Sequence, residues 1–196
     1  MQSRAVMQAF VVDLLKKNLP PFYYYHNYEH TLYVMDKVAL IAREEHCSAR
    51  DIDLLETAAL WHDTGFIHVY SGHEKASCLL ARKYLPGYGY SETDTETICG
   101  MIMATRIPQS PQTRLQAILA DADLEYLGTA IVYAQADRLC KELQHRNPAL
   151  TNEQWQKTQV SFLEKHRYFT GFCKANREAL KDAYRRQLVA ASAHDN

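Results

Sequence analysis

The chain has 196 residues, and its composition, 47% hydrophobic and 23% charged, is that of a folded protein rather than a disordered segment. Lys and Arg total 22 against 23 Asp and Glu, a formal net charge of −1, which argues against a broad nucleic-acid-binding surface and a membrane-surface anchor. The five cysteines are scattered without a C-x-x-C pair, which disfavours a disulfide framework and a zinc ribbon. The first twenty residues lack the apolar run of a signal peptide or membrane span. We therefore expect a cytoplasmic protein.

Apolar residues recur at helical spacing along nearly the whole chain, which predicts an all-α fold in a single domain over residues 1–196. The first helix carries apolar residues from Ala5 to Leu15 and ends before Pro20-Pro21, because proline cannot continue the helical hydrogen bonds. Further helices are expected at residues 29–46, 51–63, 73–84, 93–104, 112–120 and 124–144, and in segments 151–169 and 175–192.

Several residues are typical of helix ends. Ser48 and Asp51 are possible caps of the helix at residues 51–63, and Gly65 is expected to help stop it. Thr151 and Gln154 have the spacing of a capping box. The chain has neither an internal repeat nor a long linker that would indicate a second domain.

Two histidines lie four positions apart in the stretch FYYYHNYEH, residues 22–30. His26 and His30 are flanked by tyrosines, so one interpretation is packing within an aromatic cluster. The other is metal or proton chemistry, because side chains at i and i+4 lie on the same face of a helix. This stretch alone does not separate the two.

Two further sites bring acidic groups into apolar surroundings. His62 and Asp63 are adjacent at the end of the helix at residues 51–63. In one interpretation His62 caps the last turn and Asp63 is solvated; in the other, both side chains turn toward one point in a cleft. Asp121 and Asp123 lie among leucines in AILADADLEYLG, residues 117–128. A buried carboxylate needs a partner, and a cation is one such partner. The alternative, capping of the next helix, suits Asp121 better than Asp123.

Together these residues follow the order H…HD…D on successive predicted helices. His62 follows His30 by 32 positions (62 − 30), and Asp123 follows Asp63 by 60 positions (123 − 63). In this order the sequence resembles the HD superfamily of metal-dependent phosphohydrolases. YHNYEH at residues 25–30 is similar to the Y-H-N-x-x-H pattern of cyclic nucleotide phosphodiesterases, a branch of that superfamily, and ADL at residues 122–124 is similar to the segment that carries the last metal ligand.

The resemblance implies a fold and a set of roles. It implies an HD-type helical bundle with its metal-site core at about residues 20–130, completed by the C-terminal helices. The implied metal ligands are His30, His62, Asp63 and Asp123, with Asp121 as the reserve choice. It also implies that His26 donates a proton to the leaving alkoxide. That role suits imidazole, which titrates near neutral pH and would lie one helical turn from a ligand.

This ligand set defines the chemistry that we expect. Two imidazoles and two carboxylates leave coordination positions for water and suit one divalent ion, namely Mn²⁺, Fe²⁺, Co²⁺, Ni²⁺ or Mg²⁺, more than a structural zinc. The ion would polarise a phosphoryl oxygen and activate water, while Asp63 bridges or accepts a proton. We therefore expect a phosphohydrolase that acts on a nucleotide or a similar small phosphorylated metabolite. No nucleic-acid polymer or membrane is expected as a partner, and no dimer motif is visible.

Three residues are candidates for substrate contact. His73 and Glu74 begin a predicted helix, and the resemblance implies a second metal or a phosphate near His73, although helix capping explains both residues equally well. Arg106 has the geometry to bind phosphate, with a solvated loop residue as the alternative. Dinuclear HD branches supply another histidine before the final Asp, but none lies between His73 and Asp123, which disfavours a two-metal site.

Two other functions remain open. Some HD proteins are di-iron oxygenases, but that function needs about two extra ligands, of which only His73 is evident. A non-catalytic sensor that binds a nucleotide in the same cleft is also compatible with the fold. We expect Trp61, Trp155 and Phe162 to belong to the core rather than to a base-stacking platform.

Overall fold

The computed structural model describes residues 4–194, which form ten α-helices and three short 3-10 helices without a strand. The all-α prediction is therefore confirmed for this part of the chain. Within the same residues, no helix combines the length and the apolar character that crossing a membrane requires.

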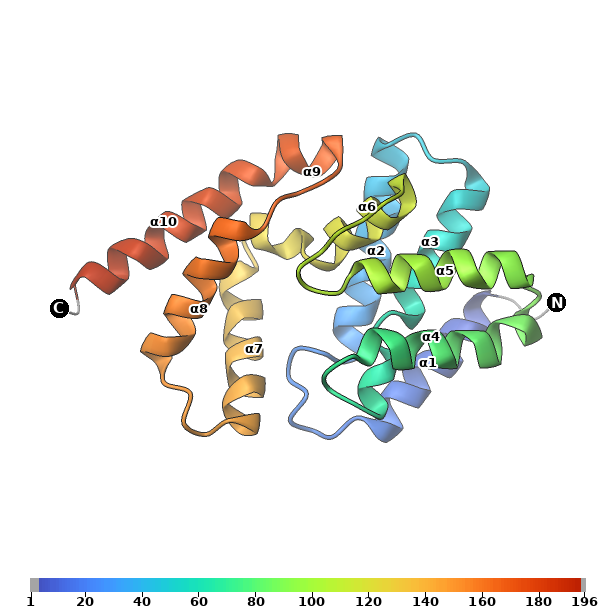
Figure 1. Cartoon of the computed structure of the whole chain (residues 1–196), viewed down its shortest axis with the longest axis horizontal. Helices are drawn as coiled ribbons and strands as arrows, with labels where there is room; N and C mark the ends of the chain where they lie inside the picture. Colours follow the sequence, from blue (N-terminus) through green and yellow to red (C-terminus); the bar gives the residue numbers. More distant parts are fainter. Residues whose placement is uncertain (1–3, 195–196) are drawn as a thin grey trace.

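Helices α1 to α6 form one side of the molecule (Figure 1). Helix α2 packs on α3 and α6, and α5 packs on α3, α4 and α6, around a core that includes Leu55, Trp61 and Ile102. The bounds are α1 Arg4–Asn18, α2 Tyr28–Glu44, α3 Ala49–Trp61, α4 His73–Tyr84, α5 Glu92–Ala104 and α6 Arg114–Asp123, with 3-10 helices η1 Thr64–Ile67 and η2 Leu85–Tyr88.

The remaining helices lie beside this bundle (Figure 1). Helix α8 packs on α10, and both α7 and α10 contact the 3-10 helix η3. A second, smaller apolar cluster that includes Leu127, Val132 and Leu163 holds them together. Their bounds are η3 Glu125–Gly128, α7 Val132–Arg146, α8 Asn152–Lys165, α9 Gly171–Asn176 and α10 Glu178–His194.

The predicted caps are present. Ser48 and Asp51 form a capping box at the start of α3, and Thr151 and Gln154 form another at α8. Each box satisfies backbone N–H groups that have no partner inside the helix, and so defines where the helix begins.

Three predicted boundaries were wrong. Helix α3 ends at Trp61, before Gly65, which lies in η1; a Cβ at Gly65 would overlap the carbonyl oxygen of His73, so the glycine permits a close helix contact. The helix predicted at residues 124–144 is divided after Gly128, whose backbone packs against Arg177. The segment 175–192 contains the end of α9 and most of α10, because the chain turns at Arg177.

Candidate metal centre

His30 lies in the first turn of α2, where Asn27 determines how the helix begins. The Asn27 side chain accepts hydrogen bonds from the backbone N–H of Glu29 at 2.8 Å and of His30 at 3.4 Å. Its amide also donates to the carbonyl oxygen of Tyr23 at 3.1 Å. The asparagine of the YHN pattern is thus an N-cap that fixes the start of the helix carrying His30.

His62 and Asp63 lie where α3 turns into η1, and both are buried, with 0% and 5% of their surface exposed. The interpretation with a solvated Asp63 is therefore wrong. The Nδ1 of His62 lies 2.7 Å from the carbonyl oxygen of Ala59, which directs the Nε2 toward Asp63 and Asp123. Such a backbone partner on the far ring nitrogen is typical of metal-binding histidines.

Asp123 is the last residue of α6, and its carboxylate meets both imidazoles. The Nε2 of His30 lies 3.0 Å from Asp123 Oδ1 and 3.5 Å from Asp63 Oδ2. The Nε2 of His62 lies 3.2 Å from Asp63 Oδ2 and 3.6 Å from Asp123 Oδ1. Three separate helices therefore bring two nitrogens and two carboxylates to one point.

This donor set fits a divalent ion. One ligand atom each from His30, His62 and Asp123 lie within 4.8 Å of one another, and ligands about 2.1 Å from a shared ion at right angles would be about 3 Å apart. Among the described residues, the Nε2 of His62 and the Oδ2 of Asp63 are buried without a hydrogen-bond partner. A buried polar atom without a partner is costly, and a cation between these atoms would remove that cost.

The pKa values of the cluster reflect the same arrangement. Burial opposes protonation of His62, but the carboxylates of Asp63 and Asp123 outweigh it and raise the imidazole pKa well above its usual range. Burial likewise opposes ionisation of Asp63 and Asp123, yet the histidines facing them keep the pKa of both carboxyl groups well below the usual value. Both carboxylates are therefore charged at neutral pH and available to a cation.

Asp121, the reserve ligand, lies away from this cluster. Its buried carboxylate accepts hydrogen bonds from the backbone N–H of Phe169 at 2.9 Å and Thr170 at 2.8 Å, and from the Thr170 hydroxyl at 2.6 Å. Nor does Asp121 cap the next helix in the chain, because it lies in the last turn of α6. Its role is to hold the chain just before α9.

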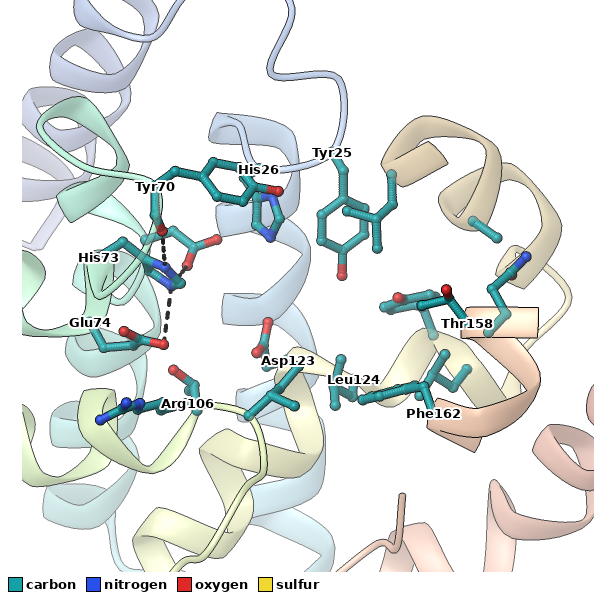
Figure 2. A pocket seen from close by; sticks show the side chains of 18 of the residues that line it. Tyr25, His26, Tyr70, His73, Glu74, Arg106, Asp123, Leu124, Thr158 and Phe162 are labelled. Atoms are coloured by element: carbon teal, nitrogen blue, oxygen red, sulfur yellow. Dashed lines mark hydrogen bonds and ion pairs between the residues drawn. The ribbon is translucent and has the colours of Figure 1, made fainter. Parts of the chain in front are cut away.

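His73 and Glu74, at the start of α4, face the other side of Asp63. The Nε2 of His73 lies 3.4 Å from Asp63 Oδ1 and 3.9 Å from Glu74 Oε1, while its Nδ1 lies 3.2 Å from the carbonyl oxygen of Tyr70 (Figure 2). The ring stacks on Phe66 with centroids 3.8 Å apart. The cap of this helix is Gly72 rather than Ser71, while Glu74 lies in the first turn as the helix-start interpretation expects, and both His73 and Glu74 line the cavity.

His26 lies beside the cluster and has a partner that the sequence analysis missed. Its Nδ1 is 2.5 Å from Oε1 of Glu142, a fully buried residue of α7. The other Glu142 oxygen accepts the backbone N–H groups of Tyr25 at 2.9 Å and His26 at 3.0 Å. Burial acts to raise the pKa of Glu142, but His26 and these N–H groups lower it. The carboxylate therefore orients the ring of His26.

Glu142 lies 116 residues after His26, on a helix whose exposed face is rich in charged residues. A glutamate between Lys141 and Leu143 has no local signal that separates it from its solvated neighbours. Only the packing of α7 against the Tyr25–His26 loop identifies it.

A cavity of about 610 Å³ opens from the metal centre. His26, His73, Glu74 and Arg106 line one end, and Asp123 and Leu124 lie between them and Phe162 (Figure 2). Arg106 is exposed on this lining. Trp61 is fully buried as expected, and Phe162 packs against the second apolar cluster while also lining the cavity. Trp155 lines the cavity and is partly exposed, so placing it in the core was wrong.

Comparisons with known proteins agree with this geometry. The sequence model of the HD domain matches residues 27–125, which are 99 of the 196 residues. A structurally similar protein is a predicted HD superfamily hydrolase from an uncultured Thermotogales bacterium, with a TM-score of 0.59 and 20% identity over 95% of this chain and 89% of that chain. No curated protein matches the sequence significantly. The matched region contains all four implied metal ligands, and the chain belongs to the HD domain family of metal-dependent hydrolases.

Proposed function

We propose that this protein is a metal-dependent phosphohydrolase that cleaves a phosphate ester of a nucleotide or a similar small phosphorylated metabolite with an activated water molecule. The observation that carries the proposal is the position of His26, which shares a cavity with the converging side chains of Asp63 and Asp123. A proton donor, a cation site and a substrate-sized cavity are the parts that ester hydrolysis requires.

His30, His62, Asp63 and Asp123 would hold the ion. When bound, a divalent ion would polarise the phosphoryl oxygen and make water a stronger nucleophile at neutral pH. The two carboxylates carry the negative charge that attracts the cation, and the backbone contact of the His62 ring fixes its orientation.

Two groups of the chain move the protons. Asp63 is placed to accept a proton from the attacking water, because its carboxylate is buried and ionised. His26, held by Glu142, is placed to give a proton to the alcohol oxygen as its bond to phosphorus breaks. The products are then the free alcohol and a phosphate group that retains the oxygen of water.

His73 and Glu74 give some support to the alternative, a di-iron oxygenase. They face Asp63, and Oε2 of Glu74 is buried without a hydrogen-bond partner among the described residues. That arrangement offers the beginning of a second ion position. Two irons per chain, together with O₂ uptake, would favour the oxygenase. Tight nucleotide binding without product would instead favour the sensor.

The proposal is tested by comparing the wild type with Asp63→Asn on cyclic nucleotides, mononucleotides, dinucleotides and generic phosphate esters, after loading with each of the five candidate ions. We expect turnover by the wild type and its loss in the variant. Elemental analysis separates loss of the ion from loss of chemistry. Unchanged turnover in Asp63→Asn at unchanged metal content would contradict the assignment.

A further inference from the structure

The cavity is polar at one end and apolar at the other. Every charged residue that lines it comes from the segment before α7, namely Asp63, Glu74, Lys75, Arg106 and Asp123, and the two histidines, His26 and His73, lie there as well. The helices α7, α8 and α10 contribute no charged side chain to the lining. A ligand that fills the cavity therefore places a charged group at the metal centre and an uncharged group beyond it.

The far part is built from aliphatic and aromatic side chains. Leu124, Leu127, Val132, Ala136, Leu139 and Phe162 line it, and all six belong to the second apolar cluster. Val132, Ala136 and Leu139 come from α7 and Phe162 comes from α8, so both helices contribute to this lining. Apolar lining of this kind favours a ligand part that gains free energy by leaving water.

Two hydroxyl groups of the far part already have partners. The hydroxyl of Tyr184 donates to Oε1 of Gln159 at 2.6 Å, and the hydroxyl of the exposed Thr158 donates to the backbone carbonyl of Gln154 at 2.8 Å. A nucleobase carries several donors and acceptors that lose water when buried. Trp155 and Gln159 also line this part and carry N–H donors, but the six hydrocarbon side chains offer none, so the wall favours a hydrocarbon over a base.

We infer that the substrate is a phosphate ester of an aliphatic alcohol, with the phosphate at the metal centre and the hydrocarbon chain between α7 and α8. This inference rests on the proposed function, because it names the alcohol part of that substrate. Water adds its oxygen to phosphorus, the bond between phosphorus and the alcohol oxygen breaks, and the aliphatic alcohol leaves with a proton from His26.

The test uses a homologous series on the full-length, Mn²⁺-loaded protein. Calorimetric titration with n-alkylphosphonates, from butyl to decyl, measures binding without hydrolysis, and we expect affinity to rise about fourfold per methylene until the cavity is full. Hydrolysis is followed in parallel on n-alkyl phosphates by the release of inorganic phosphate, with AMP and cyclic AMP as the nucleotide arm. The longer alkyl esters should exceed both nucleotides in kcat/KM.

A pair of α7 variants tests where the hydrocarbon chain of the ligand lies. Ala136→Phe adds a ring to the cavity wall, and we expect it to weaken binding of the octyl and decyl compounds far more than binding of the butyl compound. Ala134→Phe places the same ring on the exposed side of α7, outside the lining, and should behave as the wild type. A thermal melt verifies that both variants are folded.

The outcomes separate this inference from the proposed function. Hydrolysis with no dependence on chain length, or with nucleotides preferred, would overturn the inference and leave the hydrolase assignment intact. Chain-length-dependent phosphonate binding that Ala136→Phe weakens for the octyl and decyl compounds, without hydrolysis of any ester, would support the apolar site and overturn the hydrolase. Equal effects of Ala136→Phe and Ala134→Phe on the series would also overturn the inference.

Discussion

The two ends of the cavity are held in different ways. At the metal end, three of the four histidine rings have a partner that fixes them: Ala59 for His62, Tyr70 for His73 and Glu142 for His26. At the far end, the lining is apolar, and contacts between hydrocarbon side chains have no preferred direction. Hydrogen bonds therefore fix the side chains of the metal end, whereas the far end can select a ligand only by the shape and volume of its apolar lining.

The same contrast extends to two buried histidines. His62, near the metal end, faces two carboxylates that raise its pKa despite burial. His166, at the C-terminal end of α8, is buried beside Lys181 and Arg167, and burial together with these cations lowers its pKa to about 3. The surroundings of His62 therefore favour a positive charge, whereas those of His166 keep its imidazole neutral.

The largest expected effect separates the two aspartates of α6. Asp123→Asn removes the negative charge of a proposed metal ligand and should lower metal affinity by more than the roughly 10–100-fold typical of outer-shell partners. Asp121→Asn should keep the metal and lower the free energy of unfolding by about 1–3 kcal/mol, because it disturbs the buried bonds to Thr170. Calorimetric metal titration and urea unfolding measure the two. An equal decrease in metal affinity in both variants would contradict the different roles assigned to Asp123 and Asp121.

The second effect concerns Glu142. Replacement by Gln exchanges one carboxylate oxygen for an NH₂ group and disturbs the contact that orients the His26 ring, so we expect kcat to fall about 10–100-fold with metal content unchanged. An unchanged kcat in Glu142→Gln would contradict this orienting role.

The third prediction follows from the raised pKa of His62. Its imidazole must lose a proton to bind a metal ion, so protons compete with the ion until the pH exceeds that raised pKa. Metal affinity should keep rising above pH 6.5, by up to about tenfold per pH unit for one proton released. Titrations at pH 6, 7 and 8 check this, and a flat profile over that range would contradict the raised value.

The smallest effect concerns His166. Its folded pKa lies below the unfolded value of about 6.5, so the unfolded chain binds more protons as pH falls. The free energy of unfolding should therefore decrease below pH 6.5, and by pH 5.5 the wild type should lose about 1.4 kcal/mol more than His166→Gln. Urea unfolding at pH 7.5 and 5.5 measures this difference. Identical pH slopes in the two proteins would refute it.

The sequence was most informative where chemistry is local. The HD pair and the predicted caps Ser48–Asp51 and Thr151–Gln154 each lie within a few residues, and helix geometry determines what such residues do. Glu142 and the cavity wall were missed because they depend on how α7 and α8 pack far along the chain. Trp155 illustrates the same limit, since an apolar face looks alike whether it covers a core or a cavity.

Gly65 helps to preorganise the candidate metal centre. Its backbone N–H donates to the Ser77 hydroxyl at 2.8 Å, and that hydroxyl donates to the carbonyl oxygen of His62 at 2.6 Å. Because Gly65 lies directly against the backbone of His73, the spacing between two histidine-bearing segments is set by main-chain contact rather than by flexible side chains. Such a frame is preorganised, so little ordering entropy is lost when the ion arrives, and even an added methyl group at Gly65 would push these segments apart.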